Sequence, residues 1–123
     1  MAHLINLKTF TDSRGNLTVI EKVIPFQIKR IFYIYGVDRS VRGGHRHKKT
    51  VQAAICLRGK CTIFNDNNVT RDEFILDSPD KCLILNPEDW HKMYDFSEEA
   101  ILMVLASEFF DQSDYIYDAY DRV

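Results

Sequence analysis

The 123-residue sequence has few features that would take it out of the ordinary globular class. No apolar run approaches the ~18 residues that a membrane helix needs, and the first residues lack the apolar core of a signal peptide. Sixteen basic and eighteen acidic residues give a net charge of -2, so the chain has no basic field that would attract nucleic acid. We therefore expect a cytoplasmic protein with neither a membrane nor a nucleic-acid partner.

Cysteine, proline and glycine are also scarce. Cys56, Cys61 and Cys82 form neither a CxxC pair nor an even set, and each lies in an apolar segment, so we expect buried thiols without a redox or metal role. There is no internal repeat and no Gly/Ser/Pro-rich linker, and the length suits one hydrophobic core. These absences predict a single domain spanning residues 1–123.

Short apolar segments separated by turn residues fill most of the chain, with no convincing helix before the last fifteen residues. In RIFYIYGV, Tyr33 and Tyr35 alternate with Phe32, as in a strand with two different faces. VQAAICL and CTIF are separated only by residues 58–60, which predicts a β-hairpin. A count of about nine or ten strands predicts an all-β sandwich or barrel, and we favour a jelly roll.

The end of the chain, SEFFDQSDYIYDAYDRV, differs in character because it is rich in aromatic residues. Ser113 and Asp114 have side chains that can cap a helix. We therefore expect a short C-terminal helical segment that packs against the barrel.

The most informative stretch is RGGHRHKKTVQAAICLRG, from Arg42 to Gly59. His45 and His47 are two positions apart, so on a strand both side chains would point to the same face. Histidine has an unperturbed pKa of ~6.5 and can take or give a proton near neutral pH. The stretch therefore predicts a cavity with two histidines on its wall, suited to metal binding or to proton transfer.

The spacing of this stretch resembles the first signature of the cupin family, in which HxH is followed by Glu and Gly. His45, His47 and Gly59 match, and Gln52 occupies the place of the Glu. The resemblance implies a cupin jelly-roll barrel. It also implies that a metal, if bound, would be held by the two histidines, Gln52 and the later His91.

We nevertheless expect no catalytic metal and no other cofactor. A neutral amide at Gln52 offers a carbonyl oxygen where a carboxylate would bring negative charge to the ion. Arg46, Lys48 and Lys49 surround the histidines with positive charge, which disfavours a cation and favours an anionic ligand.

A narrower resemblance covers nearly the whole chain. The following segments, in this order and spacing, are similar to those of the dTDP-4-keto-6-deoxyhexose 3,4-ketoisomerases: DSRGNL, RIFYIYGV, RGGHRHKK, QAAICLRGKC, NPEDWHKMYDFSEEAILMVLAS and FFDQSDYIYDAYD. The resemblance implies an enzyme that moves the ketone of a dTDP-linked 4-keto-6-deoxyhexose from C4 to C3 through an enediol. Its product would supply an aminotransferase that makes a 3-amino-3,6-dideoxyhexose for a surface glycan.

The same resemblance implies roles for particular residues. His45 would be the main base, His47 would serve the second carbon or the migrating hydroxyl proton, and Tyr33 would act as a hydrogen-bonding acid. The substrate-binding residues would be Arg14 and Arg42 at the diphosphate, Gln52 at the sugar or a histidine, and Tyr35 as a stacking residue.

The family resemblance also implies a homodimer that exchanges N-terminal strands, and the alternation in HLINLKTF allows it. Three alternatives remain: a nucleotide-sugar 3,5-epimerase, a metal-dependent cupin dioxygenase, and a sugar-binding cupin without activity. The family often has a small residue between the two histidines, whereas this chain has Arg46. If that side chain pointed into the cavity, it would add a contact to phosphate or sugar.

Overall fold

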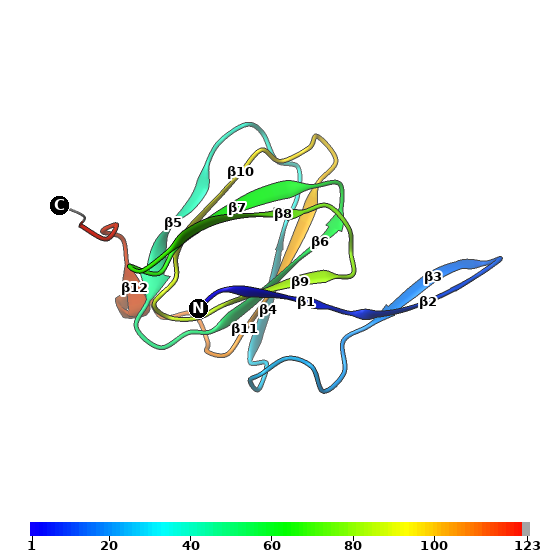
Figure 1. Ribbon diagram of the computed structural model, residues 1–123, viewed down its shortest axis with the longest axis horizontal. Helices are drawn as coiled ribbons and strands as arrows, with labels where there is room; N and C mark the ends of the chain where they lie inside the picture. The colour runs from blue at the N-terminus through cyan, green and yellow to red at the C-terminus, as the bar shows by residue number, and fades with distance from the viewer. Residues whose placement is uncertain (122–123) are drawn as a thin grey trace.

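The computed structural model describes residues 1–121, and two antiparallel five-stranded sheets face each other in it (Figure 1). The first sheet has the order β1 (His3–Asn6), β9 (Lys81–Leu85), β6 (Gln52–Arg58), β11 (Ile101–Ala106) and β4 (Arg30–Ile34). The second has the order β12 (Tyr115–Ile116), β5 (Arg42–His47), β10 (Trp90–Tyr94), β7 (Cys61–Asp66) and β8 (Arg71–Leu76). The predicted all-β sandwich is confirmed.

The central strands of the first sheet are buried on both faces. Alternate residues of β6, such as Ala54 and Cys56, pack against the second sheet in the main core. Ala53 and Ile55 point the other way, into a second cluster that Phe26 of the connection before β4 partly covers. This double burial explains why the sequence VQAAICL is apolar at successive positions, and all three cysteines are free and buried, as expected.

The predicted hairpin around Gly59 is wrong. β6 pairs with β11 and β9, and β7 pairs with β10 and β8, so the two residues between β6 and β7, Gly59 and Lys60, carry the chain from one sheet to the other. Gly59 has φ +71°, and a Cβ there would lie 2.2 Å from Oγ of Ser97. Strand periodicity describes each strand but not its partner, so the sequence could not distinguish a sheet crossing from a hairpin. The next turn, after Asp66, does close the hairpin of β7 and β8.

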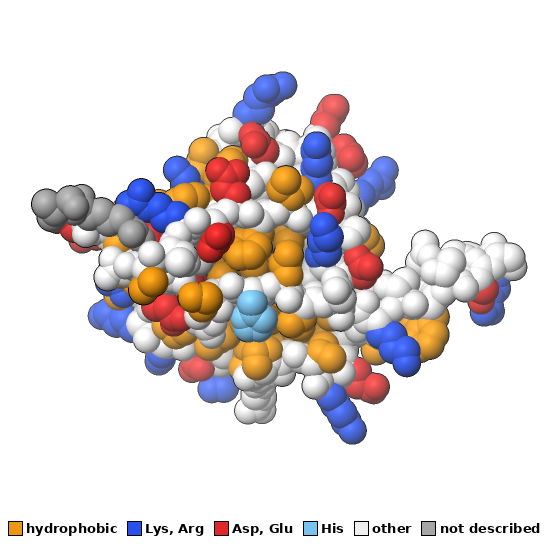
Figure 2. Space-filling view, in the orientation of Figure 1, with side chains coloured by type: hydrophobic (Ala, Val, Ile, Leu, Met, Phe, Trp, Pro, Cys, Tyr) orange, Lys and Arg blue, Asp and Glu red, His pale blue; other side chains and the backbone are white. Residues whose placement is uncertain are grey.

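The N-terminal region forms an arm. HLINLKTF, expected as one strand, divides at the buried Leu7 into β1 and β2 (Lys8–Asp12). β2 pairs only with β3 (Gly15–Val19), and this two-stranded hairpin projects from the sandwich (Figure 1). Phe10 and Leu17 on it are 53% and 60% exposed, and Figure 2 shows one hydrophobic patch on the otherwise mostly polar and charged arm.

The expected C-terminal helical segment is only a 3-10 turn, Gln112–Asp114. Ser113 and Asp114 do not cap it: the carboxylate of Asp111 accepts a hydrogen bond from the backbone N–H of Ser113 and serves as the cap. Asp114 is instead buried. No helix in the described part of the chain is long and apolar enough to span a membrane.

Candidate functional site

A cavity of about 310 Å³ opens between the two sheets, beside β4, β5, β6 and β10. Four of the predicted site residues line it: Tyr33, Arg42, His45 and Gln52. Three residues that were not predicted to contact substrate line it too: Arg30, His91 and Tyr115. The cavity is therefore lined by cations, imidazoles and aromatic rings, as a site for an anionic, ring-shaped ligand would be.

β5 places its two histidines on one face, as the spacing predicted. Their ring centroids lie 5.0 Å apart with nearly perpendicular planes. His45 is also the register partner of His91 on β10, with ring centroids 4.9 Å apart. Gly43 permits this close pairing, because it has φ +83° and a Cβ there would lie 3.1 Å from the carbonyl oxygen of His91. Three imidazoles therefore meet at one point of the sandwich.

His47 lies deeper than His45 and is held by a carboxylate. Its Nδ1 lies 2.8 Å from Oδ2 of Asp114, and both side chains are almost fully buried. Burial alone would raise the pKa of Asp114, but hydrogen bonds from Thr50, the backbone of Lys49 and His47 hold it below its ordinary value. Because an ionised carboxylate only accepts, Nδ1 of His47 carries the proton and Nε2 has the free lone pair.

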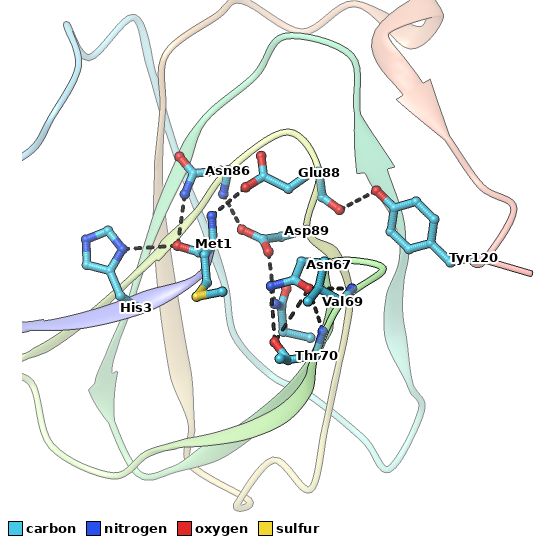
Figure 3. Close-up of polar contacts among 10 residues, drawn as sticks. Met1, His3, Asn67, Val69, Thr70, Asn86, Glu88, Asp89 and Tyr120 are labelled. Atoms are coloured by element: carbon cyan, nitrogen blue, oxygen red, sulfur yellow. Dashed lines mark hydrogen bonds and ion pairs between the residues drawn. The ribbon is translucent and has the colours of Figure 1, made fainter. Parts of the chain in front are cut away.

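His91 is oriented by the start of β10. Its Nδ1 donates to the carbonyl oxygen of Asp89 at 3.0 Å, and the buried carboxylate of Asp89 accepts from Asn65 and from the backbone of Asn86. The same turn is tied down by contacts drawn in Figure 3, among them Tyr120 donating to the carbonyl oxygen of Glu88. His91 thus also presents an unprotonated Nε2.

All three imidazoles favour the neutral form. Burial, and next the neighbouring His47, lowers the pKa of His45 to about 4. Burial, and next His45, lowers that of His91 to about 3. The pKa of His47 is also lowered by burial, although Asp114 opposes the change. At neutral pH the histidines are therefore bases rather than acids.

Several buried polar atoms around the histidines lack a hydrogen-bond partner among residues 1–121. They include Nε2 of His47, Nε2 of His91 and Oε1 of Gln52. Unsatisfied buried acceptors cost free energy, so native proteins keep them mainly where a ligand or water completes them. This part of the site is therefore built to receive hydrogen-bond donors.

Two arginines supply positive charge. Arg42 opens β5 and lines the cavity. The sequence reasoning missed Arg30, whose guanidinium stacks on Phe32 at 4.6 Å and on Phe110 at 5.2 Å. Arg30 faces the cavity because it shares the inward face of β4 with Phe32. That alternation was visible in the sequence and was the available signal.

Tyr33 and Tyr35 lie at the rim rather than in the depth of the cavity. Tyr33 borders the cavity but is 62% exposed, on the outer face of β4, where its ring stacks on Tyr35 at 5.8 Å. Tyr35 and Arg42 together line a smaller neighbouring hollow of about 140 Å³. Arg46 is turned away, with its guanidinium over the ring of Tyr120 at 4.7 Å, so it does not line the cavity.

Three predicted site residues do not line the cavity. His47 lies behind His45, Tyr35 borders the neighbouring hollow, and Arg14 stands on the projecting hairpin. Arg14 lies in the turn of this hairpin and forms an ion pair with Asp12 at 2.7 Å. The hollow beside Arg14 is lined only by residues of the hairpin itself, such as Phe10 and Leu17. Arg14 is therefore not part of the lining of the cavity in its own chain.

The donor set does not fit the divalent ion that many cupins bind. In the part of the chain that the structure describes, no group of three or more His, Cys, Asp or Glu is arranged to hold a metal ion. Gln52 provides no charge, and the buried carboxylate of Asp114, beside His47, is already engaged with four donors. We therefore derive no step through a metal.

Comparison with known proteins gives a consistent assignment. The family model described as "FdtA: WxcM-like, C-terminal" matches residues 1–122. A TDP-4-oxo-6-deoxy-alpha-D-glucose-3,4-oxoisomerase from Aneurinibacillus thermoaerophilus is 44% identical over 97% of this chain and 89% of that protein. A variant of the 3,4-ketoisomerase QdtA from Thermoanaerobacterium thermosaccharolyticum, in complex with TDP-4-keto-6-deoxyglucose, gives a TM-score of 0.91 at 42% identity, covering 95% of this chain and 87% of that chain.

A more distant match concerns the fold alone. The dTDP-6-deoxy-D-glucose-3,5-epimerase RmlC from Legionella pneumophila gives a TM-score of 0.80 at 13% identity, covering 93% of this chain and 70% of that chain. This likeness confirms the predicted cupin-type jelly roll.

Proposed function

Because the chain belongs to the TDP-4-keto-6-deoxyhexose 3,4-ketoisomerase family, we propose that it converts dTDP-4-keto-6-deoxyglucose into the corresponding 3-keto sugar by histidine-mediated proton transfer. The observation that carries the mechanism is the position of His45 on the wall of a cavity that Arg42 and Gln52 also line, where burial lowers the pKa of His45. In this arrangement the base His45 and the amide of Gln52 would contact the sugar, and the cation Arg42 would contact the diphosphate.

In the first half of the reaction, His45 takes the proton from C3, which the neighbouring C4 carbonyl makes acidic. The electron pair of the C3–H bond forms the C3=C4 double bond, and the carbonyl oxygen at C4 becomes an enediolate oxygen, which takes a proton from the acid assigned below, Tyr33. Arg30 and Arg42 line the cavity and would stabilise this negative charge.

In the second half, the hydroxyl proton at C3 leaves, the C3 carbonyl forms, and C4 receives a proton. We assign the hydroxyl proton or the second carbon to His47, whose unprotonated Nε2 has no partner among the described residues. Tyr33, at the rim, is assigned as the hydrogen-bonding acid that orients the sugar. Neither step needs an oxidant, since the electrons removed from C3 are placed on C4.

We further propose a homodimer in which the projecting hairpins are exchanged. The hairpin of one copy would cover exposed apolar residues of both and carry Arg14 toward the diphosphate in the other copy's site. Its exposed Phe10 and Leu17, and the position of Arg14 outside its own cavity, support this arrangement. Arg42 would hold the diphosphate from the same chain, and Tyr35 beside it would stack on the thymine.

The product is a 3-ketone, and a ketone is the substrate that an aminotransferase needs to install an amine at the same carbon. We therefore propose that the enzyme supplies the synthesis of a 3-amino-3,6-dideoxyhexose for a surface glycan. This places it after the step that makes the 4-keto sugar and before the transamination.

The direct test is NMR spectroscopy of the sugar after incubation of the purified enzyme with dTDP-4-keto-6-deoxyglucose. We expect the carbonyl resonance to move from C4 to C3. A product that keeps the C4 carbonyl but is inverted at C3 and C5 would identify a 3,5-epimerase, and binding without conversion would identify a non-catalytic module. Either result would overturn the proposal.

A further inference from the structure

The buried pair of His47 and Asp114 joins strand β5 to the C-terminal segment. The two residues are 67 positions apart in the chain, and β12, which follows Asp114 directly, pairs Tyr115 with His47. The segment that carries Asp114 is therefore fixed onto the strand that carries the histidine. We infer that Asp114 is a positioning residue that holds His47 in the tautomer with a proton on Nδ1 and a free lone pair on Nε2.

The hydrogen bonds divide between the two carboxylate oxygens. Oδ1 of Asp114 accepts from the backbone N–H groups of Lys48 and Lys49, at 3.1 Å and 2.8 Å. Oδ2 accepts from Nδ1 of His47 and from the hydroxyl of Thr50. Four donors surround a group with four lone-pair positions, so the carboxylate is held rigidly and His47 cannot rotate away from it.

The lone pair left on His47 has a use in the proposed reaction. Nε2 is buried and has no partner in the described chain, and the ring lies 5.0 Å from that of His45, which lines the cavity. A neutral imidazole of fixed tautomer is a base at one nitrogen only. This inference rests on the proposed function for its catalytic consequence, but the tautomer itself does not depend on any substrate.

Asp114→Asn is the decisive change because an amide has one acceptor and one donor end. If its oxygen stays on the two backbone N–H groups, its NH₂ group faces His47 and donates to Nδ1. The proton of His47 must then move to Nε2, which turns the base into a donor. Replacing the carboxylate that orients a catalytic histidine imposes the wrong tautomer in this way.

The experiment compares wild type, Asp114→Asn and Asp111→Asn by heteronuclear NMR of the ring nitrogens and by steady-state kinetics. Asp111 is an exposed neighbour on the same turn that caps it, and asparagine also caps well, so this control should resemble wild type. In wild type we expect the proton of His47 on Nδ1. In Asp114→Asn we expect it on Nε2, with kcat lowered ~10²- to 10⁴-fold and KM little changed.

The pH profile gives a second readout that a merely structural role would not move. Asp114 opposes the effect of burial on the pKa of His47, so removing its charge lowers that pKa further. The acid limb of the residual activity should therefore shift to lower pH in Asp114→Asn and stay in place in Asp111→Asn.

The inference is overturned if wild-type His47 carries its proton on Nε2, a result that needs no variant to fold. It is also overturned if Asp114→Asn folds with the His47 tautomer unchanged, whatever its activity. A wild-type enzyme that fails to convert dTDP-4-keto-6-deoxyglucose would reject the proposed function instead, because the NMR measurement is made without substrate.

Discussion

His45 and His91 are register partners on β5 and β10, and their rings lie 4.9 Å apart inside the sandwich. Folding therefore buries both imidazoles, and His45 disfavours the charged form of His91. The pKa of His91 falls to about 3 and that of His45 to about 4, mainly through burial. The pair is stable only while both rings are neutral.

We predict that the free energy of unfolding falls as the pH is lowered from about 6.5 toward 4. In this range His45 and His91 bind protons in the unfolded chain, at an ordinary pKa of ~6.5, and remain unprotonated in the folded chain. The stability is thus complete above pH ~6.5 and is lost on acidification, by up to about 1.4 kcal/mol per pH unit for His91 alone. Urea unfolding across this pH range measures it.

The matched controls are His91→Gln and His3→Gln. His91 is fully buried and His3 is exposed, so only the first change should make the dependence of stability on pH shallower. The relevant quantity is the slope, since His91→Gln also lowers stability at every pH by disturbing the core. Equal slopes for wild type and His91→Gln would contradict the burial argument.

Replacing His45 by Asn should lower kcat by ~10²- to 10⁴-fold without unfolding the protein, because an amide has no basic nitrogen at this pH. Circular dichroism and thermal unfolding check the fold, and the keto-sugar assay measures turnover. His3→Gln again serves as the control. Wild-type turnover in a folded His45→Asn protein would remove His45 from the mechanism.

The wild-type dependence of kcat/KM on pH provides a separate test of His45. A base with an ordinary histidine pKa would lose activity below pH ~6.5, whereas a pKa of about 4 keeps His45 unprotonated well below that. We therefore predict that the acid limb lies below pH 6. An acid limb centred at pH ~6.5 would show that the pKa of the catalytic base in the free enzyme is not lowered.

The sequence predicted the features of this site that depend on neighbouring residues, but not those that depend on contacts between distant segments. The two-residue spacing of His45 and His47 sufficed to place both rings on one face, because strand alternation is local. The partners came from elsewhere in the chain: His91 through the register of β10, and Asp114 through a turn more than sixty residues later. No local period encodes such pairings, so Asp114 was expected to cap a helix instead.

The fold showed the same division. Individual strands were predicted from their alternation, but the turn at Gly59 was assigned to a hairpin although it crosses between sheets. The sheet to which a strand belongs depends on which apolar faces meet in the core. Because β6 is apolar on both of its faces, its sequence did not indicate which sheet it joins. The arm formed by β2 and β3 also escaped prediction, because HLINLKTF reads as one strand.

For the proposed dimer, Phe10→Ser combined with Leu17→Ser should shift the protein toward monomer by removing exposed apolar surface from the arm. Light scattering measures the mass, and Val69→Ser, an exposed apolar residue on the turn after β7, is the control. Arg14→Ala should raise KM while leaving the mass unchanged. A wild-type monomer would refute the exchange.

Treatment with a chelator should leave turnover unchanged. Gln52 offers no charge to an ion, the carboxylate of Asp114 is occupied by four donors, and no group of three or more His, Cys, Asp or Glu among the described residues is arranged to hold a metal ion. The control is the same incubation without chelator. Loss of activity that returns on adding ferrous iron would favour the dioxygenase-type cupin instead.

The most direct measurement is the position of deuterium after the reaction is run in heavy water with dTDP-4-keto-6-deoxyglucose. Proton transfer through an enediol predicts a 3-keto product labelled at C4, together with label at C3 of any recovered substrate. His45→Asn should suppress both. Label at C5 with the carbonyl still at C4, or a 3-keto product free of solvent deuterium at C4, would contradict ketone migration by exchangeable histidine bases.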